Sequence, residues 1–179
     1  MYVLITFLVE YIGFYLLYIN PIEKIHFHLY VFYRPIGFLV LSLFFSKIVS
    51  NPAVSKLILF LIPVILLASL YFMLMGKDSK FHSQFGLVSK FLLVIYSILY
   101  LKQILNSEES IFSYPYFWTV TGILTFYAGY FFLSGFINYI SVQNLELAQK
   151  LFNINHFLNI IYYSLITYGF ICQRRLAKS

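Results

Sequence analysis

Residues 54–75 read VSKLILFLIPVILLASLYFMLM and contain one charged residue, Lys56. The stretch matches the roughly 20 apolar residues that an α-helix needs to cross about 30 Å of hydrocarbon. It therefore predicts a transmembrane helix. Pro63 lies inside it and predicts a kink, because proline removes one amide hydrogen bond.

Similar apolar stretches occur on both sides of this one. Short connections that contain turn residues, such as Asn20-Pro21 and Asn51-Pro52, separate them. Short connections favour antiparallel packing of consecutive helices. The sequence predicts an all-α fold, a polytopic transmembrane helix bundle that forms a single integral membrane domain over residues 1–179. Its six membrane-spanning helices are expected at residues 1–20, 28–49, 54–75, 87–105, 116–140 and 151–172.

The composition supports a membrane protein. Hydrophobic residues make up 61% of the chain and charged residues 10%, with a mean hydropathy of +0.85, whereas soluble domains carry about 25% charged residues. The 12 Lys and Arg residues outnumber the 6 Asp and Glu residues, but they are spread over short loops. This pattern indicates anchoring at lipid head groups, so the expected partner is the lipid bilayer and not nucleic acid.

The distribution of basic residues gives an orientation only at the end of the chain. With six spans, equal numbers of basic residues fall on the two sides of the membrane. The basic tail Gln173–Lys178 after the last helix favours a C-terminus in the cytoplasm. The only cysteine, Cys172, excludes an internal disulfide.

Glu10 lies midway along the first predicted helix, where an ionisable residue costs about 2.5–3.5 kcal/mol on insertion scales. The second helix enters the membrane from the same side and carries Arg34. The two residues differ in depth by about 6 Å at 1.5 Å per residue, within reach of an Arg side chain. We expect a Glu10–Arg34 ion pair. In the alternative, Arg34 extends to the head groups and Glu10 is protonated or hydrogen-bonded.

The last predicted helix begins with polar residues. His156 and Asn159 share one face, because they are three residues apart. The simpler interpretation is hydrogen bonding between helices. In the alternative, His156, His28 and Glu10 line one pocket, in which the two histidines ligate haem iron or a divalent metal.

The fifth predicted helix has a row of small residues, at Gly122, Thr125, Gly129 and Gly135. Small residues at this spacing let helix backbones approach closely. Packing within the chain is the first interpretation, and the seam of a homodimer is the alternative.

Helices five and six contain PYFWTVTGIL at residues 115–124 and HFLNII at residues 156–161, and residues 35–38 read PIGF. With these motifs the chain resembles a group of uncharacterised small polytopic membrane proteins of Bacteroidetes-type bacteria. The group has an acid where this chain has Gly37, so the resemblance does not extend to an acid-dependent role. The resemblance implies a bacterial origin and a family fold of six to seven helices, so a further N-terminal helix could precede Met1.

The expected function is that of a multi-pass protein of the bacterial inner membrane, a non-enzymatic sensor or accessory subunit. It would bind a small ligand or a membrane partner, either another membrane protein or a second copy of the chain. One alternative is a haem- or metal-binding redox enzyme that uses Glu10, His28 and His156. Another is a small transporter with Glu10, Arg34 and Asn159 along its pathway.

Overall fold

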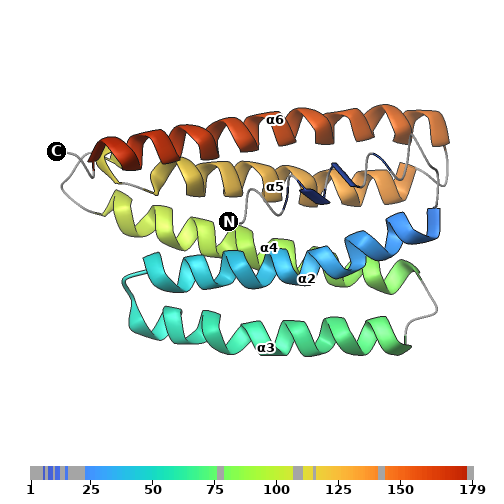
Figure 1. Cartoon of the computed structure of the whole chain (residues 1–179), viewed down its shortest axis with the longest axis horizontal. Helices are drawn as coiled ribbons and strands as arrows, with labels where there is room; N and C mark the ends of the chain where they lie inside the picture. Colours follow the sequence, from blue (N-terminus) through green and yellow to red (C-terminus); the bar gives the residue numbers. More distant parts are fainter. Residues whose placement is uncertain are drawn as a thin grey trace. The chain divides into compact units, whose positions relative to one another are not determined.

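The computed structural model of the chain describes residues 6, 8–9, 11–12, 15, 23–75, 79–106, 111–114, 116–140 and 144–176. Within these ranges the regular structure is helical (Figure 1). The long elements are α2 (Glu23–Ile48), α3 (Pro52–Met75), α4 (Ser79–Leu105), α5 (Phe117–Ile140) and α6 (Leu145–Leu176), and a short 3₁₀ turn, η2 (Ile111–Ser113), precedes α5. The prediction of an all-α fold is confirmed for this part of the chain.

The observed helices are longer than several of the predicted ones. Helix α4 begins at Ser79 and not at residue 87, while α6 extends beyond both ends of the predicted stretch 151–172. The predictions followed apolar content, but Lys, Gln and Glu are good helix formers and continue a helix past its apolar part. Of the first predicted helix, residues 6, 8–9 and 11–12 are α-helical, and the rest of that prediction lies outside the described residues except for Tyr15.

The chain divides into two compact units, Met1–Ser89 and Lys90–Ser179. In the first unit, α2 and α3 lie side by side as an antiparallel hairpin (Figure 1). The turn between them caps α3, because Asn51 Oδ1 accepts a hydrogen bond from Ala53 N at 2.9 Å. Pro52 follows at the first helical position, where a missing N–H costs nothing.

The α2–α3 hairpin buries large apolar side chains. They follow helical spacing on both helices and comprise Phe38, Leu41 and Phe45 on α2 with Ile58, Ile62 and Ile65 on α3. Another face of α3 exposes Leu57, Phe60, Val64, Leu67 and Tyr71. An apolar face of this length is expected where lipid and not water surrounds a helix.

In the second unit, α5 and α6 form another antiparallel hairpin (Figure 1). Asn144 caps α6, because its Oδ1 accepts a hydrogen bond from Leu147 N at 3.0 Å. Aromatic rings gather where α5 begins: Trp118 lies 4.9 Å from Tyr168 of α6 and 5.8 Å from Phe112 of η2, measured between ring centroids.

Among the described residues, three segments are long and apolar enough to cross a membrane: Pro52–Tyr71, Gly86–Leu105 and Phe117–Ile137. The chain is therefore a membrane-associated helical protein. The three segments are fewer than the six spans expected from the sequence. Helix α6 is long enough but gives no such segment, because Asn153, Asn155 and Asn159 lower the hydropathy of its first half.

Candidate functional site

The second unit places a lysine ammonium group on an aromatic ring. Lys90 Nζ of α4 lies 3.6 Å from the centroid of the Tyr130 ring of α5. This distance is well within the range of a cation–π interaction. Lys90 also falls inside the apolar segment Gly86–Leu105, where a charged side chain is costly and the negative face of a ring offsets part of the loss of water.

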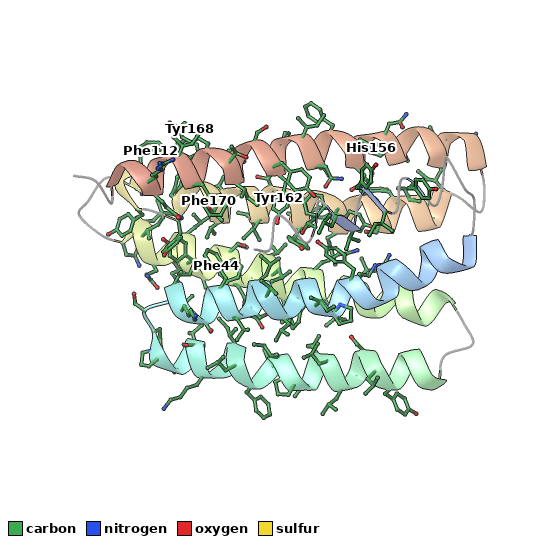
Figure 2. All side chains as sticks on the ribbon, in the orientation of Figure 1. Phe44, Phe112, His156, Tyr162, Tyr168 and Phe170 are labelled. Atoms are coloured by element: carbon green, nitrogen blue, oxygen red, sulfur yellow. The ribbon has the colours of Figure 1, made fainter. Side chains whose placement is uncertain are left out.

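A row of aromatic rings leads from Tyr130 to the centre of the α5–α6 hairpin. Phe126 lies 6.0 Å from Tyr130 on the same helix and stacks on Tyr162 of α6 at 4.9 Å, with 27° between the ring planes. Tyr162 is 2% exposed and lies on the side of α6 that faces α5 (Figure 2). The ring pair shows that the face of α6 with Tyr162 is packed against the face of α5 with Phe126.

Two glycines of α5 fix its register against α6. A Cβ atom on Gly122 would lie 3.1 Å from Leu165 Cβ, and one on Gly129 would lie 2.8 Å from a methyl carbon of Leu158. Because the helices are antiparallel, three residues forward on α5 correspond to three residues back on α6. Counted from the contact of Gly129 with Leu158, Asn155 is therefore level with Phe132. Tyr130 is two residues from Phe132 on the same helix, so its depth is close to that of Asn155.

Asn155 brings an amide group to this depth. Its Oδ1 atom is buried and has no hydrogen-bond partner within the part of the chain that the structure describes. A buried polar atom without a partner costs about 1–3 kcal/mol, so such atoms call for an explanation. Asn159 lies one turn further along the same face of α6 and is half-buried.

We call Lys90, Tyr130, Asn155 and Asn159 the polar layer. It combines one cation, one phenol and two amides at similar depth in a three-helix unit that is otherwise rich in apolar side chains. The ammonium group can hold an anion, and the amides can donate and accept hydrogen bonds. The layer is thus equipped to bind a polar group among apolar helices.

The residues of the predicted histidine pocket are described to different extents. His156 is exposed on α6, and Figure 2 labels it there. His28 lies in α2, but its side chain is outside the described part, as is Glu10 entirely. The pocket of Glu10, His28 and His156 stays a prediction. Among the described residues, no group of three or more His, Cys, Asp or Glu side chains could hold a metal ion.

Arg34 lies near the middle of α2 and is exposed. Its Nη1 atom is 3.9 Å from the position that a Cβ atom on Gly86 would occupy, so the guanidinium group lies against α4 where that helix has no side chain. The neighbouring residue, Tyr33, donates a hydrogen bond to Thr6 Oγ1 at 2.6 Å. This bond joins the first segment of the chain to α2. The Glu10–Arg34 ion pair stays a prediction, because Glu10 is not described.

The four small residues of α5 have different surroundings. Gly122 and Gly129 contact α6 as described above. Thr125 donates a hydrogen bond within its own helix, to Thr121 O at 2.9 Å. Gly135 is exposed, and a Cβ atom there would meet nothing within 4 Å.

The sequence analysis identified Asn159 on the polar face of the last helix but did not indicate the contact between Lys90 and Tyr130. A lysine inside the predicted apolar helix 87–105 is a sequence feature that could have pointed to this position. Its partner lies on another helix, and the rotation of one helix against the other cannot be read from apolar periodicity.

The fold and the polar layer define a class: helical, membrane-associated proteins that carry polar groups within apolar helices. No family model, curated protein or solved structure matches the chain.

Proposed function

We propose that the chain is a multi-pass protein of the bacterial inner membrane that binds a small ligand at the polar layer. It acts as a non-enzymatic sensor or accessory subunit. The observation that supports the proposal best is the ammonium group of Lys90 on the Tyr130 ring inside an apolar segment. An ionisable group at such a place is costly, and in membrane proteins it commonly marks a functional site.

The composition of the layer favours binding over catalysis. An ammonium group supplies charge and amides supply directional hydrogen bonds, which together hold a ligand. The signal passes to another membrane protein or to a second copy of the chain through helix contacts. The resemblance to the Bacteroidetes-type group, which rests on the motifs of helices five and six, is part of the same proposal.

The proposal includes six spans and a cytoplasmic C-terminus. The test uses a Cys172→Ser background with single cysteines introduced at Ser50, Asn106 or Asn144, and labels intact cells with a membrane-impermeant maleimide. We expect the cysteine at position 144 to react from outside. Those at positions 50 and 106, and a C-terminal tag, should become accessible only after permeabilisation.

The C-terminal tag decides whether α6 spans the membrane. If it does, Asn144 and the C-terminus lie on opposite sides. A tag that is accessible together with position 144 in intact cells would contradict six spans.

Ligand binding is tested by thermal unfolding of the purified chain in a neutral detergent against a library of soluble metabolites and amphiphiles, neutral and anionic. We expect at least one compound to raise the melting temperature of the wild type and to have no such effect on Lys90→Met. Lys102→Met is the matched control, since Lys102 is an exposed lysine at the other end of the same helix. The proposal fails if no compound stabilises the wild type, or if stabilisation is the same in Lys90→Met.

A further inference from the structure

We infer that the ligand of the polar layer is an anionic phospholipid with a hydroxylated head group, whose phosphate binds Lys90. The inference rests on the proposed function, because it names the chemistry of the ligand at the same site. Three features of the second unit support it: the depth of the layer, the aromatic residues around it and the buried oxygen of Asn155.

The layer lies close to one end of the apolar segments. Lys90 is four residues from the start of Gly86–Leu105, about 6 Å at 1.5 Å per residue. Tyr130 is seven residues from the end of Phe117–Ile137, about 10 Å by the same measure. These two ends lie together, because Lys90 contacts Tyr130. The ammonium group therefore lies about 6–10 Å inside one end of the apolar segments, where apolar helices surround it but a head-group phosphate of that leaflet is within reach.

Exposed aromatic side chains surround the layer at the same depth. Phe91 follows Lys90 and is 49% exposed, and Phe132 of α5 is 64% exposed. Phe157 of α6 is 62% exposed and is level with Tyr130 in the register set by Gly129 and Leu158. Such rings contact acyl chains and lipid ester groups well. A small soluble anion would gain nothing from them, so the surroundings favour a lipid.

The chemistry of the polar groups favours a phosphate beside a hydroxyl group. Lys presents a compact positive charge with three N–H donors, so its contact with one ring face is compatible with a phosphate oxygen on another side. The buried Oδ1 atom of Asn155 has no donor in the described part of the chain. Asn155 itself is only half-buried, so a rotation of its side chain toward the head groups would let a glycerol hydroxyl donate to this oxygen. Ion pairs at this depth are stronger than in water because the local dielectric constant is lower.

The experiment measures lipid binding to the full-length chain in a neutral detergent by native mass spectrometry and by thermal unfolding. The probes are phosphatidylglycerol, phosphatidylcholine of the same acyl chains, and glycerol 3-phosphate. The variants are Lys90→Met, Lys90→Arg, Asn155→Leu and the control Lys102→Met. Monodispersity and the melting temperature without added lipid show which variants are folded.

We expect phosphatidylglycerol to bind the wild type more tightly than phosphatidylcholine does. Lys90→Met should weaken phosphatidylglycerol binding by about tenfold to a hundredfold, because a hydrogen-bonded charge is lost. Lys90→Arg and Lys102→Met should keep most of the binding. Asn155→Leu should weaken it by about threefold to tenfold, since a single neutral hydrogen bond is lost. If Lys90→Met does not fold, the difference between the two lipids and the effect of Asn155→Leu carry the test.

Several outcomes would overturn the inference. Equal binding of the two lipids would exclude recognition of the anionic group. Equal losses of phosphatidylglycerol binding in Lys90→Met and Lys102→Met would show that the total positive charge, and not the position of Lys90, is responsible. If glycerol 3-phosphate competes as well as the lipid, the ligand is a soluble anion, and the proposed function survives while the lipid is excluded. A further outcome is that no anionic probe binds, but a neutral compound of the library stabilises the wild type and not Lys90→Met. In that case the inference of a lipid fails, while the proposed ligand site at the polar layer is supported.

Discussion

The two helical hairpins of this chain are built on the same plan but are packed differently. Both α2–α3 and α5–α6 are antiparallel, and in each an asparagine caps the second helix, Asn51 in the first hairpin and Asn144 in the second. In the α2–α3 hairpin the buried positions carry large side chains such as Phe45 and Ile58. In the α5–α6 hairpin, glycines bring the backbones together.

The difference shows two ways to hold helices together where lipid removes the usual hydrophobic driving force. Without that force, association depends on van der Waals packing and on hydrogen bonds between helices. Interdigitated side chains give contact area at a larger separation, and glycines allow close approach. The first hairpin should therefore be sensitive to lost volume and the second to added volume.

The largest expected effect is in the first hairpin. Ile58→Ala removes most of a side chain that is 1% exposed and should lower the free energy of unfolding by about 2–5 kcal/mol, because the packing is lost and a cavity remains. Unfolding by SDS in mixed micelles measures the change. Leu59→Ala, next to it and 45% exposed, is the control and should have a small effect. Equal effects of the two would refute the packing role of Ile58.

The second hairpin should respond to the opposite change. A Cβ atom on Gly169 would lie 2.5 Å from Thr119 Oγ1 and 3.2 Å from Thr119 N, so Gly169→Leu forces the helices apart. We expect a loss of about 1–3 kcal/mol in the same titration. Gly135→Leu is the matched control, because nothing lies within 4 Å of its Cβ position. An equal loss in both variants would show that the seam is not responsible, because leucine has a higher helix propensity than glycine at both positions.

The asparagine caps of α3 and α6 should contribute equally to the stability of the two hairpins. Asn51→Ala and Asn144→Ala each remove a side-chain acceptor from the first turn of a helix, and each should cost about 1 kcal/mol. The same titration measures both variants, with Asn51→Asp and Asn144→Asp as controls that keep an acceptor. A cost confined to one hairpin would mean that the caps, and not only the seams, differ.

The smallest effect is expected where the first segment meets α2. Tyr33→Phe removes the hydroxyl that donates to Thr6 Oγ1 at 2.6 Å and should cost about 0.6 kcal/mol, the average for hydrogen bonds between membrane helices. A double-mutant cycle with Thr6→Val isolates the bond. Additive losses in the cycle would show that the two groups contribute independently.

Local sequence predicted much of the fold but less of the site. Continuous apolar stretches and the turn at Asn51-Pro52 gave the helices and several of their ends, because both signals lie within a few neighbouring residues. The polar extensions of α4 and α6 were missed, since helix formation continues past the apolar part. For the site, the sequence analysis found the polar face of α6. It did not find that Lys90 and Tyr130 lie at the same depth.

The sequence by itself determined that the chain is helical, apolar enough for a membrane and divided by a turn at Asn51-Pro52. Only the tertiary structure decided that Gly122, Gly129 and Gly169 lie in a seam while Gly135 does not, and that Lys90 meets Tyr130. Composition and capping act between near neighbours in the chain. The rotation and register of one helix against another depend on side chains far apart in sequence, which only packing brings together.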